Sequence, residues 1–479
     1  MHKCYCYNML ALKLEYFAVI GSYVINYVDN VFKHDYNKRT YVLYAKGGDK
    51  LKNDKFRDPI HGFIEVKSGE LKIINSRPFQ RLRYIKQLAM TCYVFHGAEH
   101  TRFEHSLGVM HLVTKAFNSA IQGFEDEFPE PKRAWYEQLL RLIALLHDIG
   151  HAPFSHASEK LFSDGMEHED YTVKIINETE IADSILEIGQ EFVGRYGEEY
   201  NITPKLLCDI YRGRDAGPNS EFMFLKSFMD SELDCDKMDY LLRDSYYCGV
   251  KYGVYDIERL ISSFTIYFKD DCPRLAIQHG GVQAFEEFVL ARYFMFIQVY
   301  FHRTRRYFDI MLVRALKTVL PDGVYPIDTE EYLKWDDCKV MQALKENIQD
   351  ESCRNIVSRI VYPRVCYTKT HPAEADKREF QRNFVGLSEK VGKENLIVDK
   401  SAGKMPHKIP KRVEFSDEKA IIIYDEKTGR VTTISEESEI INALSEKIDI
   451  MRIYCAPNVA GKAFEYMKDV NNSIMEDEL

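Results

Sequence analysis

The sequence contains no CxxC pair, although it has eleven cysteines among 479 residues. Cys4 and Cys6 form the only close pair, and the others are scattered along the chain. A zinc ribbon needs paired cysteines at short spacing, so this pattern argues against one. Because the chain is long and shows no clear secretory signal, we expect reduced thiols and a cytoplasmic protein.

The sequence also has no excess of positive charge. It carries 64 Lys and Arg against 74 Asp and Glu, which gives a formal net charge of −10. A protein that binds nucleic acid mainly by electrostatics needs the opposite balance, so nucleic acid is not expected as the main partner. A local basic pocket for phosphates is compatible with this charge, because a pocket needs only a few Arg and Lys.

No membrane span is expected from the apolar stretch near the N-terminus. Residues 16–28 count only thirteen positions, and charged residues bracket them at Lys13, Glu15 and Asp29. A helix that crosses a bilayer needs about 20 apolar residues. We expect a packed helix or strand in an N-terminal extension of unknown role, residues 1–50. A membrane-associated segment and a wrongly assigned start codon are the alternatives.

Helical patterns dominate what the sequence does contain, and there is no internal repeat. Apolar residues at three- and four-residue steps are typical of packed helices. They recur in segments 79–90, 105–120, 135–147, 169–179, 236–247 and 282–318. This pattern predicts a helical domain over residues 51–325.

The amino-acid composition changes after about residue 325. Segments 357–370 and 420–434 are rich in β-branched and aromatic residues, and the second predicts two strands around a turn at Glu426 to Gly429. Residues 451–457 predict another strand, and the charged stretch 375–411 is expected to be mobile. The predicted fold is mainly α, with a helical core and a smaller α+β C-terminal lobe over residues 326–479.

The stretch LLHDIGHAPFSH at residues 145–156 contains the first indication of chemistry. His147 and Asp148 follow an apolar run, and both residue types are good ligands for a divalent transition metal. Adjacent side chains on a helix point about 100° apart, so they converge only where a helix ends. Gly150 and Pro153 supply that end.

More ligands must come from elsewhere, because two do not hold a catalytic metal. His105 lies upstream in a predicted helix, and four acids lie downstream in ELDCDKMDYLLRD: Asp234, Asp236, Asp239 and Asp244. One of these acids could close the site. An isolated His–Asp pair is more often structural, but three such segments in apolar helices indicate a shared metal site, since buried charges must be compensated.

These segments carry a family resemblance. The order H…HD…D resembles the HD-domain metal phosphohydrolases. Five stretches further resemble the deoxynucleoside triphosphate triphosphohydrolases: DPIHGFIEV, FQRLRYIKQL, RFEHSLGV, HDIGHAPFSH and DCDKMDYLLRD. The branch most similar contains the vertebrate enzyme with a sterile alpha motif, although no such motif is apparent here. The resemblance covers residues 54–320 and continues faintly to residues 455–458.

The resemblance implies that the metal ligands are His105, His147, Asp148 and Asp236. It thereby selects Asp236 among the four downstream acids. It also implies iron or manganese at this site, with magnesium helping to hold the phosphates, whereas ligand type alone allows several divalent metals.

The reaction implied is attack of water on the α-phosphorus of a deoxynucleoside triphosphate, which releases tripolyphosphate and a deoxynucleoside. His168 matches the catalytic histidine that supplies a proton, and His151 matches a supporting histidine beside it. Their ordinary pKa lies close to working pH, as proton transfer requires. Glu159 stands where the family tends to have Asp.

Substrate contacts are also implied by the resemblance. The residues that match phosphate contacts are Arg102, His156, Lys237 and Arg292. Gln87 and Asp244 match residues that hydrogen-bond the 3′-hydroxyl, and Tyr240 and Tyr300 match aromatics on the sugar. Tyr300 is expected to leave no room for a 2′-hydroxyl. Phe301 replaces a family Gln, so base contacts are expected to differ.

The resemblance is weakest at the residues that would bind a regulatory nucleotide. The similar enzymes are homotetramers that are activated by nucleotides bound between subunits, so a homo-oligomer, dimer or tetramer, is expected. Gln80 and Arg83 match residues that read a guanine activator, but Asn75 replaces the Asp that accepts both guanine N–H groups. Arg57 also replaces a family Asn. The base of the activator, and the need for one, stay open.

Two other functions are compatible with the sequence. One is an HD-domain phosphohydrolase that acts on a nucleoside monophosphate or a cyclic nucleotide. The other is a nucleotide sensor or nucleic-acid-binding scaffold without catalysis. No matched metal ligand is missing, which favours an enzyme.

Overall fold

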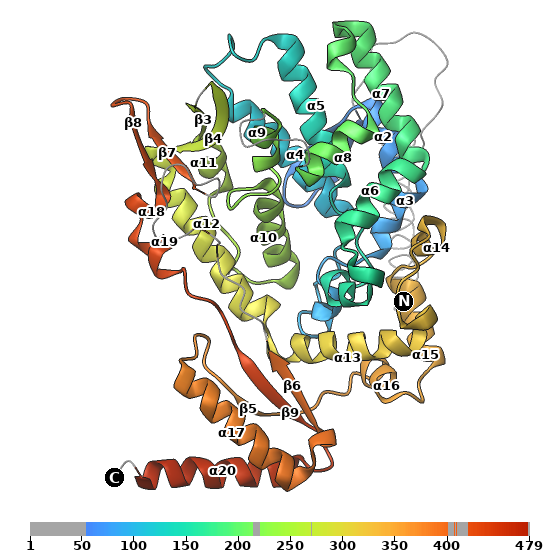
Figure 1. Ribbon diagram of the computed structural model, residues 1–479, viewed down its shortest axis with the longest axis vertical. Coiled ribbons are helices and arrows are strands. Elements are labelled where there is room, and N and C mark those ends of the chain that lie inside the picture. The colour runs from blue at the N-terminus through green and yellow to red at the C-terminus, as the bar shows by residue number, and fades with distance from the viewer. Residues whose placement is uncertain are drawn as a thin grey trace, which may run out of the picture. The chain divides into compact units, whose positions relative to one another are not determined.

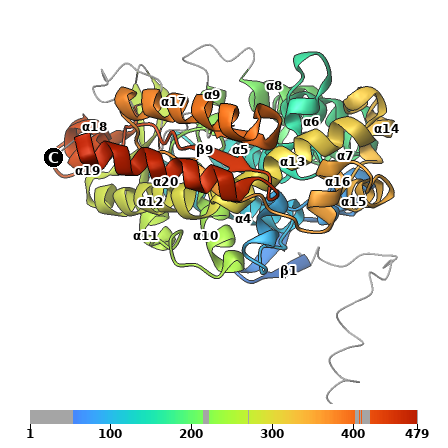
Figure 2. The ribbon, with the colours of Figure 1, turned by 90° about the horizontal axis from the view of Figure 1, so that it is seen from below.

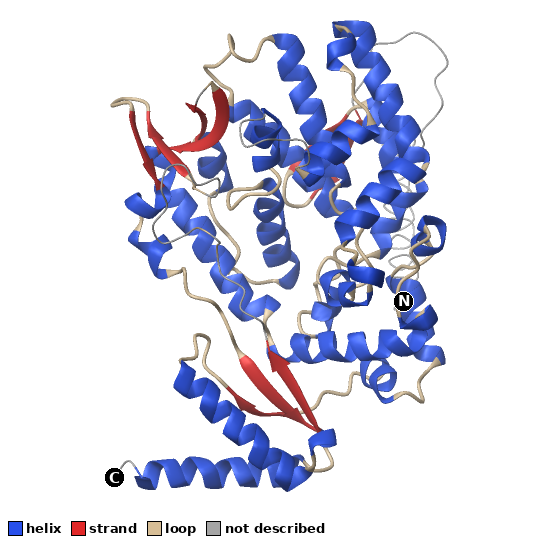
Figure 3. Ribbon diagram, viewed as in Figure 1, coloured by secondary structure: helices blue, strands red, loops and turns tan. Residues whose placement is uncertain are grey.

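The computed structural model describes residues 54–213, 221–269, 271–400, 407, 409 and 420–477 (Figure 1). The predicted N-terminal extension, residues 1–50, lies outside these residues. Helices make up most of the described chain, and the strands form three small sheets (Figure 3). The predicted fold class, mainly α with a smaller α+β lobe, is therefore confirmed. No helix in the described ranges is both long and apolar enough to cross a membrane.

The structure contains the following elements. The helices are α2 (Ser68–Asn75), α3 (Arg77–Gln80), α4 (Arg102–Ala120), α5 (Glu130–Leu146), α6 (His168–Glu178), α7 (Glu180–Tyr196), α8 (Pro204–Arg212), α9 (Glu221–Ser227), α10 (Cys235–Cys248), α11 (Ile257–Ser262), α12 (Val282–Met295), α13 (Arg303–Val319), α14 (Thr329–Leu333), α15 (Asp337–Glu346), α16 (Glu351–Val357), α17 (Glu374–Val391), α18 (Ile434–Glu437), α19 (Glu439–Ala443) and α20 (Ala460–Asp477). The strands are β1 (Asp54–Asp58), β2 (Gly62–Val66), β3 (Phe264–Lys269), β4 (Cys272–Gln278), β5 (Arg364–Tyr367), β6 (Leu396–Lys400), β7 (Ile422–Asp425), β8 (Arg430–Thr433) and β9 (Met451–Cys455).

Helices α4, α5 and α10 form the centre of the helical body, with α4 packed against both of the others. Their ends are set by local chemistry. Thr101 and Glu104 form a capping box at the start of α4, and Asp234 caps α10 by accepting a hydrogen bond from the Lys237 backbone N–H (2.8 Å). Helix α5 ends at Leu146, and His147 is its C-cap residue, directly before Asp148. The predicted ligands therefore lie at or near helix ends.

Two predicted helices are interrupted. Segment 79–90 is not a continuous helix, because Gln87 N–H donates to His100 O (3.1 Å) and Arg102 N–H donates to Ile85 O (3.0 Å). These tertiary hydrogen bonds replace helical ones and pair residues 85–87 with 100–102. Segment 282–318 is divided into α12, a π-helical turn (Phe296–Tyr300) and α13, with the break at Phe301.

The small lobe consists of a three-stranded sheet in the order β5-β9-β6, with α17 and α20 on one face (Figure 2). Helix α13 lies on the side of β6 that faces the helical body (Figure 1). The expectation of a mobile stretch over 375–411 is wrong for its first part, which forms α17 and β6. Buried Phe380 and Leu387 show why, since they give α17 an apolar face.

The predicted hairpin over 420–434 is confirmed as β7 and β8. It does not join the small lobe but extends the β3-β4 hairpin, with β7 parallel to β4. The segment 357–370, rich in β-branched and aromatic residues, contains β5, and the predicted strand at 451–457 is β9. Residues after 325 thus contribute both to the lobe and to the helical body. The domain boundary at 325/326 stays a prediction.

Candidate active site

Four predicted metal ligands meet in space, and we call them the metal cluster: His105, His147, Asp148 and Asp236. The Nε2 atom of His105 lies 3.0 Å from Asp236 Oδ1 and 3.6 Å from Asp148 Oδ2. His147 Nε2 lies 3.4 Å from Asp148 Oδ1 and 3.7 Å from Asp236 Oδ1. Ligand atoms bound at about 2.1 Å from one ion lie roughly this far apart. The cluster therefore needs little adjustment to close on a cation.

The orientation of His147 also fits a metal. Its Nδ1–H donates to Ala144 O (2.7 Å), which leaves the lone pair of a neutral ring on Nε2. Within the described chain, this buried Nε2 atom has no hydrogen-bond partner. An unpartnered buried nitrogen is costly unless a ligand satisfies it. Two imidazoles and two carboxylates are also a donor set suited to a divalent transition metal.

The pKa values of the metal cluster indicate which of its groups are charged. Burial lowers the pKa of His105, but hydrogen bonds to Asp236 and Asp239 outweigh it and raise this pKa to about 10. Burial opposes ionisation of Asp148, yet Arg102, which donates to Asp148, keeps its pKa well below the usual range. The carboxylates are thus ionised, and without a metal a protonated His105 compensates their charge.

A second layer of buried charge holds His105. Its Nδ1 atom lies 2.7 Å from Asp239 Oδ2, while His61 Nε2 lies 2.6 Å from Asp239 Oδ1. Arg243 donates to both oxygens of Asp239 (2.8 and 2.9 Å) and to Asp58 Oδ2 (2.9 Å). A carboxylate on the far nitrogen of a metal-binding histidine fixes the ring and makes it a stronger ligand.

The role of this layer was not predicted from the sequence. Asp239 was one of four candidate acids, and Asp58 and His61 belong to the quoted DPIHG stretch. The available signal was the spacing along α10, where Asp236, Asp239 and Arg243 stand three and four residues apart and so share a face. Gly108 is part of the same arrangement, because a Cβ there would lie 1.9 Å from Asp239 Oδ1.

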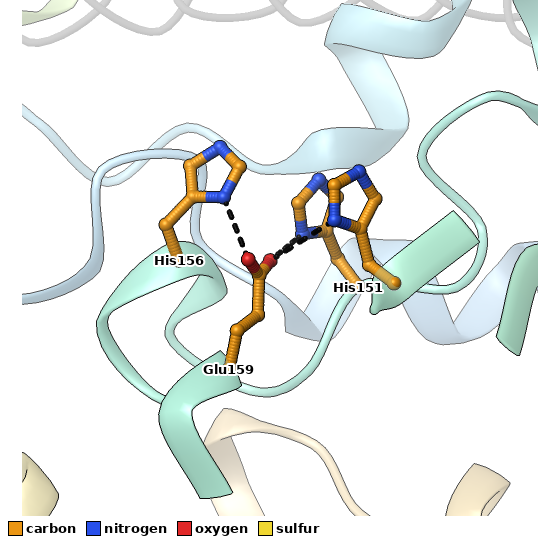
Figure 4. A group of neighbouring side chains, drawn as sticks. His151, His156 and Glu159 are labelled. Atoms are coloured by element: carbon orange, nitrogen blue, oxygen red, sulfur yellow. Dashed lines mark hydrogen bonds and ion pairs between the residues drawn. The ribbon is translucent and has the colours of Figure 1, made fainter. Parts of the chain in front are cut away.

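A second cluster lies beside the first, and we call it the glutamate cluster: His151, His156, Glu159 and His168. His151 and His156 approach Glu159 from two sides (Figure 4), with Nδ1–O distances of 2.6 and 2.9 Å. His168 Nδ1 lies 3.6 Å from Glu159 Oε1, and its ring stacks on His151 at a centroid distance of 4.0 Å. The longer glutamate thus reaches all three imidazoles.

Protonation differs between the histidines of this cluster. Burial and the Arg102 charge lower the pKa of His151 to about 4. Burial also opposes the charge on His168, but the nearby Glu159 carboxylate raises the pKa of His168 above its ordinary value. Of these two stacked rings, His168 is therefore the one better suited to carry a proton.

The close approach of His168 depends on Gly150. A Cβ at this position would lie 2.1 Å from His168 O and 2.4 Å from Thr172 N, so only glycine lets α6 come this near. Gly150 lies in the turn that follows α5. Its lack of a side chain therefore also brings His168 of the glutamate cluster close to the metal cluster.

One cavity of about 780 Å³ joins both clusters to the predicted substrate residues. The predicted site residues that line it are Gln87, Arg102, His147, Asp148, His151, His156, His168, Asp236, Lys237, Tyr240, Asp244 and Tyr300. Arg292 is absent from the described lining, and its guanidinium donates to Glu232 (2.9 Å). Lys160 and Lys226, which were not predicted, add positive charge to the wall.

The wall near α10 and the π-helical turn carries the predicted nucleoside residues. Tyr300 donates from its hydroxyl to Asp244 Oδ2 (2.7 Å), and His100 Nε2 lies 2.8 Å from Asp244 Oδ1. The rings of Tyr240 and Tyr300 meet edge to face at 6.2 Å. The buried Gln87 Oε1 atom has no hydrogen-bond partner within the described ranges. This wall combines aromatic surface with fixed polar groups.

The three predicted activator residues lie elsewhere. Asn75 is exposed at the end of α2, while Gln80 donates to Ile74 O (2.7 Å) and accepts from Arg83 Nε (2.8 Å). The Arg83 guanidinium also stacks over Phe103 at 3.5 Å. None of the three is among the described residues that line the cavity, so their predicted role concerns a separate surface.

Comparison with known proteins agrees with this arrangement. The family model of the HD domain matches residues 102–212, and the model of the HD associated region matches residues 255–471. The uncharacterized protein YwfO of Bacillus subtilis is 30% identical over 432 residues, which cover 85% of this chain and 92% of that protein. A crystal structure of a hypothetical protein from Aquifex aeolicus matches with a TM-score of 0.70 and 31% identity, over 87% of this chain and all of that one.

A further relative has a named activity. The deoxynucleoside triphosphate triphosphohydrolase SAMHD1 homolog of Dictyostelium discoideum is 31% identical over 266 residues, which cover 54% of this chain and 48% of that protein. This chain thus spans only about half the length of that relative. Together, the family models, the near full-length similarity to YwfO and the H…HD…D cluster show that the chain belongs to the HD-domain family, in a form in which an HD associated region follows the HD domain.

Proposed function

We propose that this protein hydrolyses deoxynucleoside triphosphates to deoxynucleosides and tripolyphosphate, with a divalent metal. The observation that carries the proposal is the single cavity, in which metal ligands, cationic side chains and the Tyr300–Asp244 wall face the same space. Similarity to SAMHD1 proteins named as triphosphohydrolases supports it. A nucleoside monophosphate would leave much of the positive wall unused, and a cyclic nucleotide would do the same.

The metal cluster is the proposed cofactor site, for iron or manganese, with magnesium on the triphosphate. His105, His147, Asp148 and Asp236 would hold the ion. When bound, such an ion lowers the pKa of a water molecule and neutralises charge on phosphate oxygens.

Positive side chains hold the phosphates in this proposal. Arg102 donates to Asp148 and to Ser155 Oγ (2.8 Å), so its guanidinium is fixed beside the metal cluster. Lys237 pairs with Asp234, and its charge faces the same cavity. An arginine offers a planar set of donors to phosphate, and a lysine offers a compact charge. His156 lines the same cavity, whereas Arg292 pairs with Glu232 outside the described lining and stays a predicted contact.

The proton for the leaving 5′-oxygen comes from His168. Glu159 stabilises the protonated imidazole, and stacking on His151 fixes the ring plane. A group that donates a proton during cleavage is most effective when its pKa lies near working pH. Glu159 favours the protonated form of His168, because its charge outweighs the effect of burial on the pKa of that ring.

Selection of deoxyribose rests on the π-helical turn. This turn presents Tyr300 to the cavity, and the bond to Asp244 fixes the hydroxyl. Gln87 and Asp244 hydrogen-bond the 3′-hydroxyl, while Tyr240 packs on the sugar. A rigid wall that excludes one oxygen atom rejects ribonucleotides by sterics.

Three further properties belong to this proposal. They are a homo-oligomeric assembly, activation by a nucleotide at Asn75, Gln80 and Arg83, and action in the cytoplasm. Asn75 offers one acceptor oxygen where two guanine N–H groups would need acceptors, so guanine is not assumed as the activating base.

Chromatographic analysis of the products tests the proposal. The purified protein is incubated with each dNTP and each NTP, singly and in pairs, with manganese and magnesium. Deoxynucleoside and tripolyphosphate from dNTPs are expected, and a requirement for pairs would identify the activator. Monophosphate products would indicate another HD-domain phosphohydrolase. No cleavage under any pairing would favour a sensor.

A further inference from the structure

Asp337 is a buried carboxylate that the reaction described above does not use. It is the first residue of α15, and only 5% of it is exposed. Burial raises the pKa of Asp337 to about 7, although backbone hydrogen bonds oppose this. The cap of α15 does not need this side chain, because the preceding Asp336 accepts the hydrogen bond from Lys339 N–H (2.7 Å). A buried carboxylate that serves no helix cap is costly, so its partners are informative.

Its two oxygens accept backbone N–H groups from two segments that are far apart in sequence. Oδ1 accepts from Phe154 (2.7 Å), and Oδ2 accepts from Lys86 (2.9 Å). Phe154 and Ser155 have φ angles of 57° and 55°, in the left-handed region that non-glycine residues rarely adopt. Such a backbone persists only where its surroundings hold it.

Each segment positions residues in a different part of the cavity. The Ser155 segment positions phosphate contacts, and the Lys86 segment positions nucleoside contacts. Ser155 Oγ accepts from Arg102 Nε (2.8 Å) and donates to Lys86 O (3.0 Å), and His156 follows it directly. On the other segment, Gln87 follows Lys86 and bonds His100, whose ring holds Asp244.

We propose that Asp337 is a positioning residue for the active site. It ties the Gln87 segment to the Ser155 segment, and so fixes the spacing between the groups that hold the nucleoside and those that hold the phosphates. The residue lies in the HD associated region, whereas Phe154 lies in the HD domain. The associated region thus completes the substrate site from outside the metal cluster. This inference rests on the proposed function for the identity of the two halves.

The test compares Asp337→Asn with Asp336→Asn. An amide has one acceptor oxygen, so Asp337→Asn leaves one of the two N–H groups facing another donor. Asp336→Asn makes the same chemical change one residue away, and asparagine caps a helix as well as aspartate does. Hydrogen exchange is followed for peptides that contain Lys86 or Phe154. Metal content and the KM and kcat for dNTPs and NTPs are measured on the same samples.

In Asp337→Asn, we expect faster exchange in both segments, unchanged metal content and a decrease in dNTP kcat/KM of about 10- to 100-fold, as misplacement by about 1 Å produces. Discrimination against NTPs should weaken, and Asp336→Asn should match the wild type. Unchanged exchange in both segments would overturn the proposal. Slower turnover caused by loss of the metal would also overturn the proposal, because Asp337 would then act on the metal cluster.

Folding and the identity of the reaction are controlled separately. If Asp337→Asn does not fold, Asp337→Glu keeps the charge and moves the oxygens by one methylene, so the same changes are expected. Failure of both variants to fold would overturn the positioning role in favour of a structural one. If the wild type cleaves no dNTP, the proposed function fails, while the exchange measurement still decides the role of Asp337 because it needs no substrate.

Discussion

The metal cluster and the glutamate cluster use the same residue types in opposite ways. In the metal cluster, each histidine has its Nδ1 atom held by the protein, on Asp239 for His105 and on Ala144 O for His147, and directs Nε2 toward the cluster. In the glutamate cluster, the Nδ1 atoms converge on Glu159. The metal cluster presents nitrogen lone pairs to a cation, and the glutamate cluster places three imidazole rings around one carboxylate.

Burial separates the two clusters further. The His105 side chain is 1% exposed, while that of His168, the proposed proton donor, is 19% exposed. A cation site gains from rigidity and from exclusion of water, whereas a proton donor must exchange with solvent between turnovers. The partner of Nδ1 and the exposure of the ring, more than residue type, therefore decide what each imidazole does.

The largest expected effect comes from removing a charge of the metal cluster. Asp236→Asn should abolish turnover and metal binding in a folded protein, because the amide is a weaker ligand. The loss should exceed the roughly 10- to 100-fold effect of residues that only orient a ligand. Elemental analysis and dNTP hydrolysis measure both effects, with Asp183→Asn on exposed α7 as the control. Full activity after metal-free purification would refute the ligand assignment.

A matched change in the glutamate cluster should leave the metal in place. His168→Asn should lower kcat by about 10²- to 10⁴-fold, the contribution typical of a positioned proton donor. Metal content should equal that of the wild type. If His168→Asn loses metal as Asp236→Asn does, the functional division between the clusters is wrong.

Removing a charge from the layer behind His105 should also weaken metal binding, but less than Asp236→Asn does. Asp239→Asn removes one acceptor beneath His105 and a partner of Arg243, and should weaken metal affinity by roughly 10- to 100-fold. Titration with manganese should restore turnover, which it should not do for Asp236→Asn. Failure of excess metal to rescue a folded Asp239→Asn protein would mean that Asp239 does more than orient the ligand.

The sequence predicted the metal cluster better than the layer that supports it. Ligands follow from residue type and motif, and the end of α5 at Leu146 explains how His147 and Asp148 converge. Asp239, His61 and Arg243 share one buried network, but their pairing depends on how β1, β2 and α10 pack, which no local pattern encodes.

The same limit applies to the fold. Long amphipathic helices such as α4 and α10 were predictable from periodicity. The interruption near Gln87 was not, because hydrogen bonds to the distant residues 100–102 override a helical pattern there. Asp337 was missed for a similar reason, since its partners lie about 180 and 250 residues away.

Substrate selection provides a test outside both clusters. Tyr300→Ala should relax the rejection of ribonucleotides while leaving metal content unchanged, because it opens the wall beside the sugar. The expected gain is about 10- to 100-fold in the ratio of NTP to dNTP kcat/KM, the range that one packed group provides. Tyr300→Phe keeps the ring and should retain most of the discrimination. Equal ratios in all three proteins would make Tyr300 a core residue.

The smallest effect is a shift in pH dependence, and it separates the clusters most directly. Glu159 stabilises protonated His168, so Glu159→Gln should lower the pKa of His168. Because the reaction needs the protonated ring, activity is lost as pH rises through this pKa, and the alkaline limb of kcat should move to lower pH. A shift of about 1 unit is expected from the loss of one adjacent charge. Metal content should not change. An alkaline limb that stays in place in a folded Glu159→Gln protein would mean that Glu159 does not set the pKa of the proton donor, since Glu169 Oε2 also faces His168 Nδ1, at 3.3 Å.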